Sequence, residues 1–78
     1  MKRYEILSVN DEIVSYQEAS TAYQAALLYF KETGNLDGPW RVTNLSTEKT
    51  MVVEQQVVVA LAYHQNNVGE PEEEWVLN

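Results

Sequence analysis

Residues 20–34 read Ser-Thr-Ala-Tyr-Gln-Ala-Ala-Leu-Leu-Tyr-Phe-Lys-Glu-Thr-Gly, and this stretch decides the fold class. Ser20 is predicted to be the N-cap of a helix, because its hydroxyl can accept a hydrogen bond from an otherwise unpaired N–H one turn further on. Gly34 is predicted to end that helix, because glycine adopts the left-handed conformation at little cost. The sequence therefore predicts a helix over residues 21–33.

The middle of this helix is almost entirely apolar, with Gln24 as the one polar residue between Ala22 and Phe30. Helical spacing sorts its side chains into two stripes. The first holds small residues that let a helix lie close to a sheet, and the second holds large ones. We expect the first stripe to be buried, whereas the second either joins the same core or forms a face for a dimer or a partner. The first stripe consists of Ala22, Ala25, Ala26 and Tyr29, and the second of Tyr23, Leu27 and Phe30.

Strand patterns lie on both sides of the helix. Residues 4–9 and 13–16 are rich in β-branched and aromatic side chains, and Asn10 and Asp11 between them favour a tight turn. After the helix, Pro39 cannot donate to a ladder, so a strand is expected to begin at Trp40. That strand runs over residues 40–45, with Trp40, Val42 and Asn44 on one face and Arg41, Thr43 and Leu45 on the other. A turn at 46–49 and a return strand at 50–53 complete a second hairpin.

Residues 54–67 carry two conflicting signals. The run of three valines at 57–59 favours a strand, while the alanines and leucine at 60–62 after two glutamines favour a helix. We favour a short helix over residues 55–66. The sequence thus predicts one α+β domain over residues 1–68, with an antiparallel sheet of three or four strands, one main helix, a second short helix, and an acidic tail over residues 69–78.

Charge and composition restrict the function. Twelve acidic residues stand against five basic ones, a net charge of −7, and there is no cysteine. A disulfide framework, a thiolate zinc site and a cysteine nucleophile are therefore excluded, which fits a reducing cytoplasm. The negative charge disfavours binding to nucleic acid and to anionic membranes, and it indicates that the partner is a basic protein surface. Acids within residues 5–12 interrupt any signal peptide, and the longest apolar run, residues 57–63, is far shorter than the ~20 residues of a membrane span.

Catalytic and metal-binding patterns are weak. His64 is the one imidazole and lies in no catalytic spacing, so we do not expect an enzyme. His64 and the glutamates of the tail are possible metal ligands, but they lack the order of a calcium loop, and three consecutive glutamates cannot all face one ion in an extended chain. A hydrated run of charge is the expected state, and no metal or cofactor is predicted.

The tail joins an acidic run to an apolar anchor. Its glutamates would steer the segment to a basic surface, and Trp75 would hold it there. The alternative is that residues 75–77 pair with a sheet edge or cover the core. Three acids in predicted turns are the next candidates for partner contact. The predicted partner-binding residues are Glu70, Glu72, Glu73, Glu74 and Trp75 in the tail, and Asp11, Glu12 and Glu48 in the turns.

The capped helix at 20–34 followed by the hairpin at 40–53, in an acidic chain without catalytic spacing, resembles the small phage-encoded inhibitors, including the anti-CRISPR proteins. The resemblance is one of size, charge and layout over residues 4–53. It implies a viral inhibitor that acts in the bacterial cytoplasm and blocks a basic, nucleic-acid-handling partner, with carboxylates in the place of phosphates. Two alternatives remain open: a structural homo-oligomer formed through Tyr23, Leu27 and Phe30, and a weak metal-binding domain.

Overall fold

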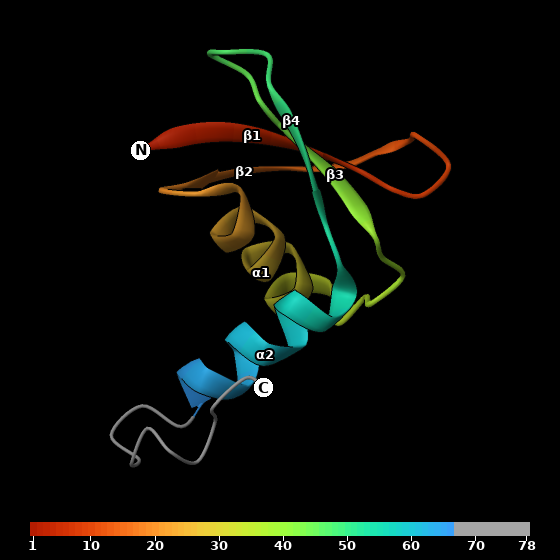
Figure 1. Cartoon of the computed structure of the whole chain (residues 1–78), viewed down its shortest axis with the longest axis vertical. Coiled ribbons are helices and arrows are strands. Elements are labelled where there is room, and N and C mark those ends of the chain that lie inside the picture. The colour runs from red at the N-terminus through yellow and green to blue at the C-terminus, as the bar shows by residue number, and fades with distance from the viewer. Residues whose placement is uncertain (67–78) are drawn as a thin grey trace.

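Two hairpins and two helices alternate along residues 1–66, the part of the chain that the computed structural model describes (Figure 1). Each half of this part has the order strand, strand, helix. The predicted α+β fold, with a four-stranded antiparallel sheet and one main helix, is therefore confirmed. The elements are β1 (Lys2–Leu7), β2 (Ile13–Ala19), α1 (Ala22–Thr33), β3 (Trp40–Asn44), β4 (Thr50–Val53) and α2 (Gln55–Asn66).

The sheet has the strand order β2-β1-β3-β4, and all its pairs are antiparallel. Its centre is the pairing of β1 with β3, which joins the two halves of the chain; Tyr4 lies opposite Asn44, and Leu7 opposite Arg41. The strands β2 and β4 form the two edges. In β2 the register shifts: Ile6 pairs with Ser15 but Leu7 with Ile13, which leaves one extra residue in a β-bulge.

The first hairpin is longer than predicted at both outer ends. The strand β1 begins at Lys2 rather than residue 4, and β2 continues to Ala19 rather than stopping at Tyr16. Polar Gln17 and Glu18 resemble loop residues in the sequence, but an edge strand accepts polar side chains because one side of it faces solvent.

The ends of α1 follow from two residues. The N-cap is Thr21, whose hydroxyl accepts a hydrogen bond from the Gln24 N–H at 3.1 Å. The prediction of Ser20 is therefore wrong by one residue, because the first helical bond runs from the Ala25 N–H to the Thr21 carbonyl. The prediction of Gly34 is confirmed: its φ is 71°, and its N–H donates to the Phe30 carbonyl at 2.7 Å.

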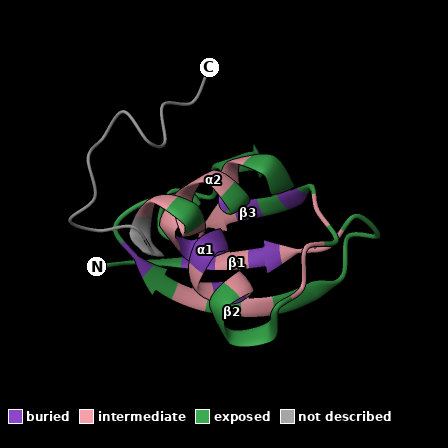
Figure 2. Cartoon of the chain, turned by 90° about the horizontal axis from the view of Figure 1, so that it is seen from below, coloured by how far each residue is buried: buried purple, intermediate pink, exposed green. Residues whose placement is uncertain are grey.

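The core lies between α1 and one face of the sheet, and Figure 2 shows buried residues on α1 and on the strands beneath it. The first stripe of α1 is buried as predicted; it consists of Ala22, Ala25, Ala26 and Tyr29. Trp40, the largest fully buried side chain, meets Tyr29 edge to face with 6.1 Å between ring centroids. The alternation of β3 is also confirmed, since Trp40 and Val42 are each 1% exposed while Arg41 is exposed.

The segment after β4 is a helix with the predicted bounds 55–66. Glu54 makes the turn, and its carbonyl accepts from the Val57 and Val58 N–H groups. The run of valines is divided between environments: Val58 is fully buried and Val59 is 45% exposed. Neither helix of residues 1–66 is long and apolar enough to cross a membrane.

Candidate functional site

The acidic tail lies outside the described residues. Its predicted contacts are Glu70, Glu72, Glu73, Glu74 and Trp75, and the structure places none of them. Six of the predicted site residues do fall within residues 1–66: the turn acids Asp11, Glu12 and Glu48, and the helix residues Tyr23, Leu27 and Phe30.

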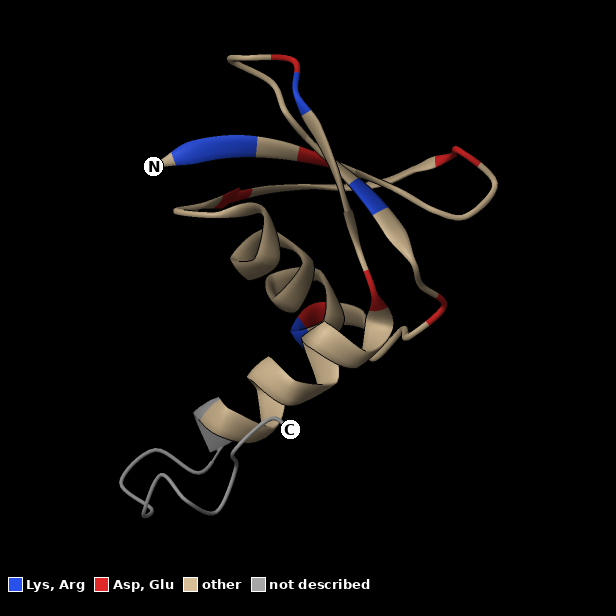
Figure 3. Ribbon diagram, in the orientation of Figure 1, with Lys and Arg blue, Asp and Glu red and all other residues tan. Residues whose placement is uncertain are grey.

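The turn acids do not form one cluster. Asp11 and Glu12 lie at the tip of the first hairpin and Glu48 at the tip of the second, and Figure 3 shows these two tips well apart. Asp11 and Glu48 both adopt a φ of 63°, which non-glycine residues rarely do. Asp11 also forms an ion pair with Arg41 of β3, so this predicted partner-binding carboxylate is neutralised within the fold.

The proposed oligomer face of α1 is divided by the fold. Leu27 is 1% exposed and shares the buried cluster with Val58 of α2, which packs against α1. The structure therefore places Leu27 in the core and not on an oligomer face, because α2 covers that side of the core. Phe30 is half-buried against the same cluster, and Tyr23 is 40% exposed.

The face of the sheet that does not carry α1 forms a second surface, which we call the outer face. The side chains of Tyr16, Ile13 and Val52 on this face are each about half exposed, at 50, 51 and 54%. Strand alternation and register place them with Arg3, Glu5, Leu7, Glu18, Arg41, Thr43 and Thr50. The outer face thus combines large apolar side chains with charged ones.

Hydrogen bonds order the polar part of the outer face. The Tyr16 hydroxyl donates to the Glu5 carboxylate at 3.4 Å, and the Thr43 and Thr50 hydroxyls lie 2.8 Å apart in a hydrogen bond. The Asp11–Arg41 pair lies at the end nearer the first hairpin turn. These contacts hold polar groups in fixed directions around exposed apolar side chains, an arrangement suited to contact with another protein.

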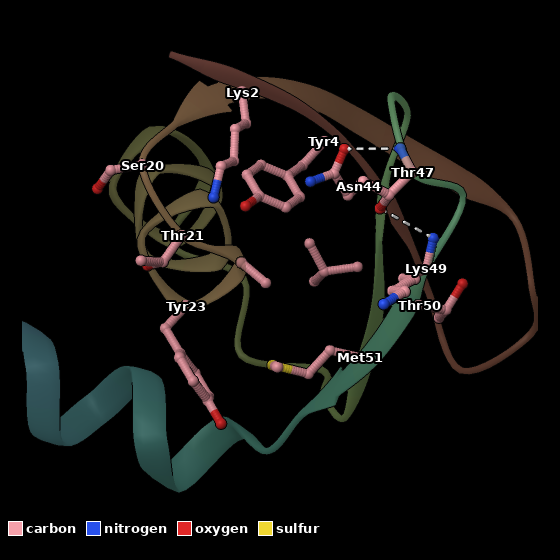
Figure 4. Close-up of a pocket in the computed structure, with 12 residues that line it drawn as sticks. Lys2, Tyr4, Ser20, Thr21, Tyr23, Asn44, Thr47, Lys49, Thr50 and Met51 are labelled. Atoms are coloured by element: carbon pink, nitrogen blue, oxygen red, sulfur yellow. Dashed lines mark hydrogen bonds between the residues drawn. The ribbon is translucent and has the colours of Figure 1, made fainter.

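A pocket of about 560 Å³ opens on the other side of the sheet, between the start of α1 and the second hairpin (Figure 4). The start of α1 forms one wall, β1 the next, and β4 with the hairpin turn the third. Lys2 and Lys49 contribute ammonium groups, and no acidic residue of the described chain lines the pocket. The lining residues are Lys2, Tyr4, Ser20, Thr21, Ala22, Tyr23, Val42, Asn44, Thr47, Lys49, Thr50 and Met51.

Tyr4 is an unusual member of this lining. Its side chain is only 5% exposed, and Figure 4 shows its hydroxyl pointing into the pocket between β1 and the start of α1. Among the described residues that hydroxyl has no hydrogen-bond partner. The oxygen is not among the fully buried unpaired atoms of the described residues, so it is open to the pocket and can hydrogen-bond whatever occupies it.

Sequence reasoning missed both of these surfaces. Alternation predicts that Lys2 shares a face with Tyr4 and that Lys49 shares one with Met51. Predicting the pocket, however, requires knowing which strands from different halves of the chain pair and the exact residue at which α1 begins. The outer face requires knowing which side of the sheet α1 covers.

Metal ligands do not gather in the described chain: no group of three His, Cys, Asp or Glu side chains within residues 1–66 is placed to hold an ion. His64 is half-buried in the last turn of α2. In comparisons with protein-family models, curated proteins and solved structures, the chain matches none of them.

Proposed function

We propose that the chain is a non-enzymatic protein-binding domain that inhibits a basic, nucleic-acid-handling bacterial protein by covering its surface. The observation that supports this most is the outer face of the sheet, where Ile13, Tyr16 and Val52 are each about half exposed. Exposed apolar side chains gathered on one face and rimmed by polar groups are typical of protein interaction sites.

Tyr16 is the expected anchor of this contact. It lies in the edge strand β2, with Ile13 three residues before it and Glu5 directly opposite in the register. A tyrosine buries a large apolar ring while its hydroxyl keeps a polar partner, which is why tyrosine is enriched among the residues that dominate binding energy.

Charge favours a basic partner over an acidic one. Eight acids and five bases lie within residues 1–66, and the other four acids lie in the tail. Around the outer face, Glu5, Glu12 and Glu18 have no ion pair within the described chain, although Arg3 lies opposite Glu18 in the register, and Asp11 is paired with Arg41. The net charge of −7 on the whole chain speeds encounter with a basic surface and disfavours binding to nucleic acid itself.

The test uses two matched tyrosine variants. The full chain, Tyr16→Ala and Tyr63→Ala are each immobilised and exposed to bacterial lysate at low and high ionic strength, and captured proteins are identified by mass spectrometry. Tyr63 on α2 is 45% exposed against 50% for Tyr16, so it controls for loss of an exposed ring. We expect one basic, nucleic-acid-binding protein that is released at high salt, lost with Tyr16→Ala and retained with Tyr63→Ala.

A direct affinity measurement on the captured protein makes the test quantitative. Loss of a buried tyrosine anchor costs about 2 kcal/mol, or roughly a 30-fold rise in Kd. Equal Kd values for the two tyrosine variants would refute the outer face as the site. A salt-resistant homodimer in light scattering that Tyr16→Ala dissociates would instead support a structural homo-oligomer.

A further inference from the structure

We propose that the pocket between the start of α1 and the second hairpin binds a small organic anion that has an apolar body. This site lies on the opposite side of the sheet from the outer face and does not depend on the proposed inhibitory function. Its volume of about 560 Å³ falls within the range of ordinary ligand sites.

The charges around the pocket select an anion. Lys2 lies in β1 and Lys49 just before β4, and β3 runs between these two strands. Two steps between neighbouring strands separate the lysines, which is about 10 Å across the sheet. Neither forms an ion pair within the described chain, although the protein as a whole carries an excess of acids. The pocket is therefore a local positive site on a negative protein.

The start of α1 adds to this positive potential. Thr21, Ala22 and Tyr23 line the pocket and belong to the cap and first turn of this twelve-residue helix. N–H groups in a first helical turn have no partners within the helix, and the helix dipole places partial positive charge there. An anionic head group is stabilised at this end of the pocket.

The floor of the pocket requires an apolar body on the ligand. Val42 is 1% exposed, Ala22 is 9% exposed, and Met51 is 43% exposed in the opposite wall. Together with the ring of Tyr4 they offer an apolar surface that inorganic phosphate alone would leave uncovered. A ligand with both an anionic head and an apolar body matches the whole lining.

The Tyr4 hydroxyl is the observation that points most directly to a ligand. It lies at the end of a side chain that is 95% buried, reaches the pocket, and has no hydrogen-bond partner among the described residues. A bound carboxylate or phosphate oxygen would accept a hydrogen bond from this hydroxyl. Because that bond is absent from the free protein, it would contribute to binding and not to folding.

Titration calorimetry on the full chain tests the proposal with four probes. Phenyl phosphate and 3-phenylpropanoate share an apolar ring and differ in the anionic head; 3-phenylpropan-1-ol keeps the ring without charge, and inorganic phosphate keeps the charge without a ring. We expect at least one of the two aromatic anions to bind at least tenfold more tightly than the alcohol and than inorganic phosphate. Aromatic anions that bind no better than the alcohol overturn the proposal.

Three variants assign the binding to the pocket. Lys49→Met is expected to raise the Kd of the tighter anion about fivefold or more, whereas Lys31→Met, with the same charge change in the last turn of α1, should leave it within twofold. Tyr4→Phe should raise the Kd about tenfold while the midpoint of thermal unfolding stays unchanged. Equal effects of the two lysine variants, or an unchanged Kd with Tyr4→Phe, overturn the proposal.

Amide chemical shifts separate this site from the outer face. On titration of the tighter anion, we expect the amide signals of Thr21, Tyr23 and Asn44 to move while those of Tyr16 and Val52 stay in place. Movement confined to Tyr16 and Val52 would overturn the pocket as the site and would leave the proposed protein contact untouched.

Discussion

Replacing Leu27 by alanine tests whether the second stripe of α1, which consists of Tyr23, Leu27 and Phe30, belongs to the core or to an oligomer face. Leu27 is 1% exposed and belongs to the same buried cluster as Val58 of α2. Truncation removes a fully buried isobutyl group and leaves a cavity that the surroundings fill only in part. Substitutions of this kind cost about 3 to 5 kcal/mol.

This loss is large for a chain of 78 residues. At about 0.05–0.15 kcal/mol per residue, the total free energy of unfolding is roughly 4–12 kcal/mol. A loss of 3 kcal/mol lowers the midpoint of thermal unfolding by about 12–24 °C in a domain of this size. The variant therefore loses a large part of its stability.

Urea unfolding followed by circular dichroism measures this loss, with light scattering to report the mass. Tyr23→Ala is the matched control from the same stripe; Tyr23 is 40% exposed, so its truncation should cost about 1 kcal/mol. A loss below about 1 kcal/mol for Leu27→Ala would refute the assignment of this residue to the core. A change from dimer to monomer in that variant would return Leu27 to an oligomer face.

Three further predictions concern single features of the fold. Glu48→Gly should raise the free energy of unfolding by about 0.5–1 kcal/mol in urea titration, because glycine relieves the cost of a φ of 63°; a loss of stability would contradict this reasoning. Thr21→Ala should cost about 1 kcal/mol in the same assay and Ser20→Ala almost nothing, and the reverse order would restore Ser20 as the N-cap. Arg41→Ala should cost no more than about 1 kcal/mol at low salt and less at high salt, since both it and Asp11 are about half exposed; a larger, salt-independent loss would show a role beyond the ion pair.

Helices were predictable from local signals, because a helix is specified by neighbouring residues. Gly34 marked the end of α1 and Glu54 with two glutamines marked the start of α2. Ser20 and Thr21 are equivalent caps in the sequence, and only the direction of the chain leaving β2 distinguishes them. The strand ends were harder to predict, since pairing partners decide how far a strand continues.

The candidate sites were less predictable, because they depend on contacts between distant segments. Leu27 shares a helical stripe with Tyr23, but the packing of α2 buries one and leaves the other exposed. The sequence predicts that Asp11 is an exposed acid in a turn, but the strand register brings Arg41 close enough to form an ion pair with it. The lysines of the pocket lie 47 positions apart in the sequence and line one pocket only because β1 pairs with β3 and β3 pairs with β4.

The repeated order of strand, strand and helix makes the loop between α1 and β3 the natural place to divide this polypeptide. A break between Gly34 and Trp40 cuts no helix or strand and leaves each fragment with its own hairpin. The central strands β1 and β3 would then be open edges that complete each other, with Ile6 returning opposite Val42. Two reporter halves fused to such fragments would signal only on reassembly, which turns the middle of the sheet into a conditional switch.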